Sequence, residues 1–140
     1  MAATCNNAAI GISFSNGGGD YFEAVFDKFT QPPRTYVQDS DLNFSIAGAA
    51  VVTGSSRPNR RTWAIAAYGT REDAFTIDEM YRAWDVDRAT GRAAVLGVTD
   101  STFVRDPSSP IVATAVFTAI PEFEQRSGNL WLISFGMTEI

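Results

Sequence analysis

The residue types that enzymes most often use for acid–base and nucleophilic chemistry are scarce in this chain. It has no histidine, the commonest general base, activator of nucleophiles and metal ligand. A Ser–His–Asp or Cys–His site therefore cannot be built. Cys5 is the only cysteine, so neither a structural zinc site nor an internal disulfide is available. Carboxylates remain the main candidates for chemistry.

The segment Asp85-Val86-Asp87 has the spacing with which calcium-binding loops begin. The rest of the loop pattern fails, because Ala89 replaces a third ligand, Thr90 replaces the turn glycine, and the acid at the twelfth position is missing. The solvated end of a helix is the better interpretation. A carboxylate pair that hydrolyses a sugar would have to come from distant parts of the chain, and the sequence neither supports nor forbids one.

Charge argues against nucleic-acid binding. The net charge is −5 and the isoelectric point is about 4.6, whereas proteins that hold phosphates need a basic patch. The only cluster of cations, Arg57, Arg60 and Arg61, fits a solvated turn or a site that pairs with acidic neighbours.

Two other patterns are better explained by structure than by ligand binding. The glycines at 17–19 are followed by no Gly-Lys-Ser/Thr ending and are not a phosphate loop. Trp63 and Trp84 could stack on a sugar or a base, but each lies on the apolar face of its own segment and is expected in the core. No catalytic, cofactor-binding or metal-ligating residue is predicted, and no enzyme activity.

Length and composition predict one domain over residues 1–140. Hydrophobic residues make up 45% and charged residues 19%, as in a soluble globular chain. No run of about 18 apolar residues is present, so no membrane span is predicted. The N-terminus lacks the pattern of a signal peptide. The chain is therefore expected to be made in a cytoplasm and to stay soluble or join an assembly.

The clearest predicted element is a helix over about 71–88. Thr70 can cap it through the backbone amide of Asp73, and Gly91 can end it. Its apolar stripe is expected to cover something apolar. The stripe consists of Ala74, Ile77, Tyr81 and Trp84, widened by Phe75 and Met80.

Alternating and β-branched patterns predict strands on both sides of this helix. They lie at 8–14, 44–52, 61–69, 92–98, 111–120 and 130–140, while 21–29 fits either a helix or a strand. We expect 44–52 to pair with 61–69, 111–120 to be buried on both faces, and 121–128 to be a connection. The predicted class is mainly β (α+β), a small antiparallel β-sandwich or split barrel with one flanking helix. Residues 1–40 form an irregular N-terminal arm and loops, and 41–140 the β-rich core.

Four segments carry a resemblance to a known family. They read RRTWAIAA at 60–67, MYRAWDVDR at 80–88, AVLGVTD at 94–100 and LISFGMTEI at 132–140. In their order and spacing they resemble the core of bacteriophage minor tail proteins, especially the N-terminal domain of distal tail proteins. The resemblance covers 44–140, about two thirds of the chain. The galectin-like second domain of that family does not follow residue 140. The resemblance therefore also fits a related adaptor, tail-tube or terminator ring with the same core.

The resemblance implies a structural protein of the virion tail. Six copies would close into a homohexameric ring around the tail channel, joining the tail tube protein to the tail-tip or baseplate hub proteins. DNA would pass through the lumen without specific binding, past an acidic wall. The long strands 111–120 and 130–140 are expected to be the free edges that pair between copies. The alternatives are a small carbohydrate- or ligand-binding β-module with a groove lined by Trp63 or Trp131, and a carboxylate-based hydrolase.

Overall fold

The computed structural model describes residues 8–37, 40–44, 50–54, 59–106 and 108–140. In these residues the chain forms nine strands and one helix. They are β1 (Ile10–Ser15), β2 (Tyr21–Phe26), β3 (Arg34–Tyr36), β4 (Ser40–Phe44), β5 (Ala50–Gly54), β6 (Arg61–Gly69), α1 (Arg71–Ala89), β7 (Leu96–Asp100), β8 (Ile111–Ser127) and β9 (Leu130–Glu139).

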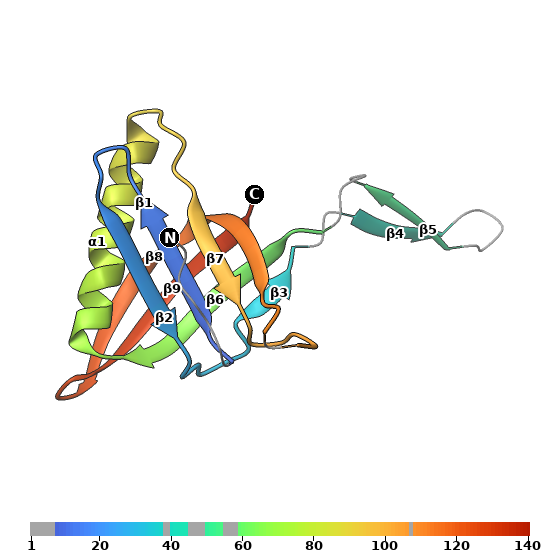
Figure 1. Cartoon of the computed structure of the whole chain (residues 1–140). Coiled ribbons are helices and arrows are strands. Elements are labelled where there is room, and N and C mark those ends of the chain that lie inside the picture. The colour runs from blue at the N-terminus through green and yellow to red at the C-terminus, as the bar shows by residue number, and fades with distance from the viewer. Residues whose placement is uncertain (1–7, 38–39, 45–49, 55–58, 107) are drawn as a thin grey trace.

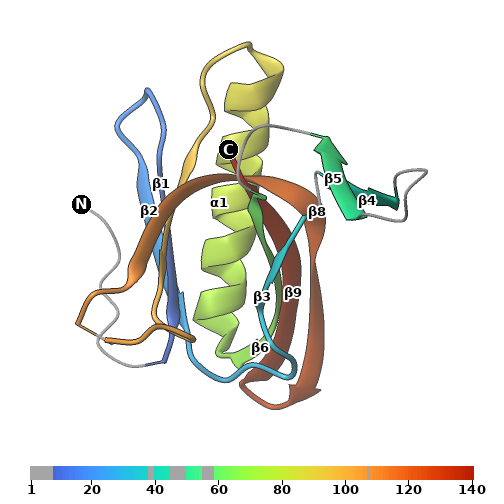
Figure 2. The same cartoon turned by 90° about the vertical axis from the view of Figure 1, so that its right-hand side faces the viewer.

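Seven strands form one antiparallel sheet in the order β2-β1-β7-β8-β9-β6-β3. The sheet does not close into a barrel, although Phe29 makes an isolated bridge with Ala67 of β6 beyond the end of β2. Strands account for 51% of the chain, which confirms the predicted class of a mainly β protein with one flanking helix. The sheet curves around α1, so that strands lie on both sides of the helix (Figures 1 and 2).

The core lies between α1 and the concave face of the sheet. Alternate residues of the strands point inward, and Trp63, Ile65 and Ala67 of β6 are all buried, as the alternation predicts. On β9 the same holds for Ile133, Phe135 and Met137. The helix contributes Ala74, Ile77, Met80 and Trp84 to the core, whereas Phe75 remains 48% exposed and does not widen the buried stripe as predicted.

Local signals fix both ends of α1. Thr70 Oγ1 accepts a hydrogen bond from the amide of Asp73, and the Asp73 carboxylate accepts one from the amide of Thr70. This reciprocal capping satisfies two backbone donors at the start of the helix. At the other end Gly91 adopts a positive φ of 79°, a conformation that glycine reaches without steric cost. The predicted helix is confirmed to within one residue.

The predicted strand at 8–14 is confirmed as β1, and 21–29 contains a strand, β2, whereas the prediction that residues 1–40 form an irregular arm does not hold for the described residues 8–37. β1 is a central strand between β2 and β7, and it brings Ile10, Ile12 and Phe14 into the core. The polar and glycine-rich turn at 16–20 hid this arrangement, because it separates two strands of only six residues each. In the turn, Asn16 Oδ1 accepts hydrogen bonds from the amides of Gly18 and Asp20.

β8 also differs from its prediction. It continues through the expected connection at 121–128 to Ser127, and its register against β9 shifts between Phe117 and Glu122. Such bulges let a strand pass an unfavourable residue such as Pro121. Its first half is not buried on both faces, since Val112 is 72% exposed. In the strand order the edges of the sheet are β2 and β3, and β9 is paired on both sides. β8 is paired on both sides only at Ile111–Ala115, and beyond Ala115 it pairs with β9 alone among the described strands.

The predicted pairing of 44–52 with 61–69 is also wrong. β4 pairs with β5 in a separate two-stranded ladder, while β6 pairs with β9 and β3. Residues 45–49 of the predicted strand 44–52 lie outside the described residues. Figures 1 and 2 show the β4–β5 ladder projecting away from the curved sheet. A ladder of two strands is at best marginally stable in water. The β4–β5 ladder is therefore expected to need packing against a further surface.

Candidate functional site

Both tryptophans that could have formed a stacking platform are used inside the protein. Trp63 is fully buried and donates its indole N–H to Asp100 Oδ2 at 2.9 Å. Trp84 is 6% exposed and donates to the carbonyl of Ala94 at 3.0 Å. The prediction that they belong to the core is confirmed.

The two acids of the calcium-like segment both lie inside α1. Asp85 accepts hydrogen bonds from Arg88, one turn further along the helix, and Asp87 lies 3.8 Å from Arg92. Asp87 is buried, so this end of the helix is less solvated than predicted. Among the described residues, no three His, Cys, Asp or Glu side chains gather closely enough to hold a metal ion.

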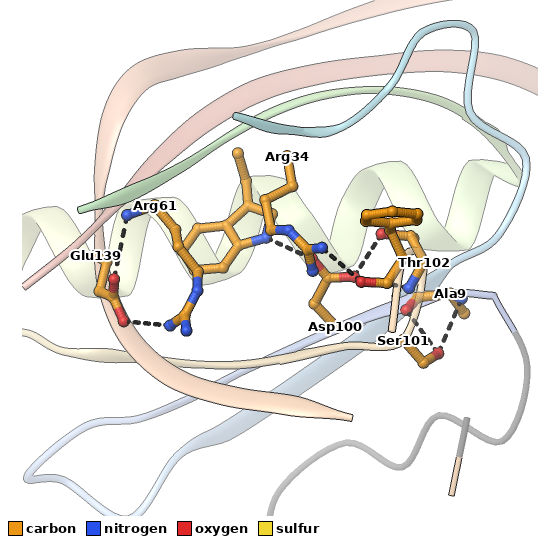
Figure 3. A network of polar contacts seen from close by, with 9 residues as sticks. Ala9, Arg34, Arg61, Asp100, Ser101, Thr102 and Glu139 are labelled. Atoms are coloured by element: carbon orange, nitrogen blue, oxygen red, sulfur yellow. Dashed lines mark hydrogen bonds and ion pairs between the residues drawn. The ribbon is translucent and has the colours of Figure 1, made fainter. Parts of the chain in front are cut away.

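The arginine cluster is partly described. Arg61 begins β6, and its guanidinium lies 2.8 Å from Glu139 at the end of β9, as the predicted pairing with an acidic neighbour requires. The backbone amide of Arg61 also donates to this carboxylate (Figure 3). Arg57 and Cys5 lie outside the described residues.

Asp100, at the end of β7, is a highly connected polar group. Its side chain has no exposed surface, and its Oδ2 accepts hydrogen bonds from Trp63 Nε1 and from Arg34 Nη1, each at 2.9 Å. Its Oδ1 accepts from the amide of Thr102 at 2.8 Å and from the Thr102 hydroxyl. Both oxygens are thus fully engaged, which favours a structural role for this carboxylate rather than proton transfer.

The network extends to the neighbouring backbone (Figure 3). Arg34 Nη2 donates to the carbonyl of Phe103, so the edge strand β3 is tied to the loop after β7. On the other side of Asp100, Ser101 exchanges backbone and hydroxyl hydrogen bonds with Ala9. The start of loop 101–110 is therefore held from three sides.

This rigid support presents one strongly exposed aromatic side chain. Phe103 is 83% exposed, the highest fraction among the exposed large hydrophobic residues. Its ring lies 5.9 Å from the guanidinium carbon of Arg34, within the range of a cation–π contact. A large apolar side chain displayed on a well-supported loop is typical of a binding anchor.

The second half of the same loop has its own local order. The hydroxyl and the amide of Ser108 donate to Asp106 Oδ1 at 2.8 and 3.0 Å, and both interactions hold the pKa of the Asp106 carboxyl below its ordinary value. At the β1–β2 end, partial burial and the hydrogen bond to Glu23 raise the pKa of the Tyr21 hydroxyl. Neither group lies in a hollow with a second titratable side chain of shifted pKa.

An aromatic notch lies on the opposite side of the chain from this loop. It lies between the start of α1 and the β8–β9 hairpin and has a volume of about 240 Å³. Its lining residues are Arg71, Ala74, Phe75, Asp78, Phe123 and Trp131. Trp131 Nε1 is enclosed and has no hydrogen-bond acceptor among the described residues. The notch is thus an apolar hollow with one donor left unused.

Two other hollows contain few groups that could take part in chemistry. One, of about 280 Å³, lies between α1 and the bulge of β8 and contains the ion-paired Asp85 and Arg88. The other, of about 610 Å³, lies over β6, β9 and β8 and contains Glu122. Like the notch with Asp78, each contains a single carboxylate, whereas glycoside hydrolysis needs two that face one bond.

Sequence reasoning missed Arg34 and Phe103, and it did not anticipate the burial of Asp100. Arg34 lay in the part expected to be irregular, and an isolated phenylalanine in a polar loop gives no periodic signal. Neither a protein-family model, nor a curated protein, nor a solved structure matches this chain. No described helix combines the length and the apolar character needed to cross a membrane.

Proposed function

We propose that this chain is a structural component of a phage virion tail. Copies of it would form a ring, homohexameric by resemblance, around the tail channel and connect the tail tube to the tail tip or baseplate. The four sequence segments described above support this proposal through their likeness to distal tail proteins. The assignment to a virion rests on that resemblance, and self-association has separate support.

The observation that carries self-association is the β4–β5 ladder. It stands apart from the seven-stranded sheet, and the ladder pairs Leu42 with Val52 and Phe44 with Ala50. Directly opposite residues of an antiparallel pair share a face, so the alternate positions 42, 44, 50 and 52 form an apolar series. Such a series gains stability only when another surface covers it. A neighbouring copy in a ring would supply that surface.

Mass measurement across concentration, followed by electron microscopy, tests the proposal. We expect an oligomer of one size and rings in the images. A chain that remains monomeric at millimolar concentration would contradict the proposal. The resemblance to tail proteins is tested separately by mixing the purified chain with tail tubes, to whose ends the rings should attach.

A second candidate function is a small carbohydrate- or ligand-binding β-module. The aromatic notch supports it, because Trp131 lines a hollow as that alternative requires. Trp63 is fully buried and cannot contribute. Changes of the chemical shifts of Trp131 and Phe75 on addition of sugars, in a chain that stays monomeric, would favour this candidate over the ring.

A further inference from the structure

We propose that Phe103 of one copy inserts into the aromatic notch of the next copy. The inference rests on the proposed self-association and specifies the contact through which it occurs. The exposed phenylalanine and the notch would form a head-to-tail interface, in which the two partners use different surfaces. Such an interface closes into a ring when its rotation divides a full turn.

Phe103 has the properties of an inserted anchor. It is 83% exposed, and its own carbonyl is fixed by Arg34, which is itself held by the buried Asp100. The backbone that carries the ring is therefore ordered before binding. An anchor of this kind loses little conformational entropy on association, which is what makes preorganised contacts strong.

The notch has the size and the chemistry for a phenyl ring. Its volume is about 240 Å³, whereas a cavity of about 150 Å³ is known to hold benzene. Phe75, Phe123 and Trp131 offer aromatic faces and edges, which pack well with a fourth ring.

The position of the two features excludes contact within one chain. In Figure 1, loop 101–110 lies on the right below β3, while the β8–β9 turn and the start of α1 lie at the lower left. The curved sheet separates them. A notch on one side and an anchor on the other are the arrangement required for head-to-tail association.

Charge favours the same pairing. Arg105 is exposed two residues after Phe103, and Asp78 lines the notch. No ion pair among the described residues engages either of these two side chains. Arg71 adds a positive charge to the notch, but its guanidinium lies over the Phe75 ring at 5.3 Å. In the proposed contact, an unpaired cation beside the anchor thus meets one unpaired acid, Asp78, in the notch.

Two substitutions and their mixture test the contact. Phe103→Asp removes the anchor, and Phe75→Asp removes one wall of the notch. Both residues are exposed, so the fold should persist, which near-ultraviolet circular dichroism checks. Phe103→Ala replaces the first variant if that variant fails to fold. Val86→Asp, at another exposed apolar position of α1, is the matched control.

Sedimentation should show the wild type and Val86→Asp associating equally. Each of the other variants alone should associate at least about thirtyfold more weakly, as for a central contact of an interface. An equimolar mixture of the two should form dimers that do not grow, because one intact anchor and one intact notch remain. If the wild type self-associates and the Phe103→Asp variant self-associates equally strongly, this inference alone is overturned. A monomeric wild type would overturn the proposed function as well.

Discussion

Asp100 joins three parts of the chain through a single carboxylate. It binds β3 through Arg34, β6 through Trp63 and loop 101–110 through Thr102. Placing a charge in a core is costly, and the cost is offset only where the partner is close and the remaining lone pairs are used. Both conditions hold here, with the Arg34 side chain only 9% exposed. Removing either Asp100 or Arg34 therefore leaves the other charge buried without its partner, which is unfavourable.

Replacement of Asp100 by alanine should lower the free energy of unfolding by about 3–5 kcal/mol, since Arg34 and the Trp63 indole lose their acceptor. Urea denaturation gives the value. The control is Asp85→Ala, which breaks an ion pair whose acid is 42% exposed and should cost less than about 1 kcal/mol. Equal losses in the two variants would contradict a central role for Asp100.

The contact between Asp106 and Ser108 has a pH dependence of its own. The hydrogen bonds from Ser108 depress the folded pKa of Asp106, so the ionised carboxylate stabilises this contact at pH values above the ordinary pKa of an aspartate. This contribution is lost as the pH falls through the folded pKa. Ser108→Ala removes the largest cause and should move the pKa of Asp106 upward in an NMR titration. Ser109→Ala should leave it in place, because Ser109 binds the Asp106 carbonyl through its backbone amide.

At the level of elements, α1 is the support on which the sheet curves. Its first turn carries the reciprocal Thr70–Asp73 cap and lies next to the notch. Thr70→Ala should therefore lower the free energy of unfolding by about 1 kcal/mol. Thr76→Ala is the matched control: its hydroxyl binds the Glu72 carbonyl within the helix, and alanine is the better helix former, so stability should stay equal or rise slightly. Thermal unfolding of both variants compares the two positions.

Elements with strong local signals could be predicted from the sequence. The helix between Thr70 and Gly91 has a cap, a periodic stripe and a terminating glycine, and β6 has large or buried apolar residues at the alternate positions 63, 65 and 67. The failures have physical causes. The pairing of β1 with β7 joins residues about 90 positions apart, and no local pattern encodes such a contact. β8 continues past Pro121 only because bulges absorb the proline, and β9 supports it.

The candidate site shows the same limit. Trp63 and Trp84 could be assigned to the core because each belongs to a periodic face. Arg34, Asp100 and Phe103 come together from β3, the end of β7 and a loop, so that only the tertiary fold reveals them. The aromatic notch combines α1 with the β8–β9 hairpin, and its residue Phe123 had been expected to lie in a connection.

At the scale of the whole molecule, the seven-stranded sheet and the β4–β5 ladder offer different surfaces for contact with another copy. The seven-stranded sheet ends in β2 and in β3, which has only three residues. Of its long strands, β9 is internal, and β8 is internal only at Ile111–Ala115. A free edge on β9, as expected from the sequence, is therefore not found, whereas β8 beyond Ala115 pairs only with β9 among the described strands and keeps one free edge. The β4–β5 ladder is separate from the seven-stranded sheet. Association should thus depend on this ladder and on side-chain contacts, with β8 beyond Ala115 as a further edge.

Substitution along β4 tests this dependence by position. Leu42→Ser and Phe44→Ser change the apolar series, whereas Asp41→Ser and Asn43→Ser change the alternate positions. Because β4 belongs to a ladder separate from the seven-stranded sheet, all four variants should unfold at the same denaturant concentration as the wild type. Only Leu42→Ser and Phe44→Ser should reduce the mass measured by light scattering at high concentration. They place a hydroxyl group where a neighbouring copy would otherwise cover an apolar side chain. If all four assembled like the wild type, the ladder would have no part in association, and if Leu42→Ser lowered the unfolding midpoint instead, the ladder would be covered by its own chain.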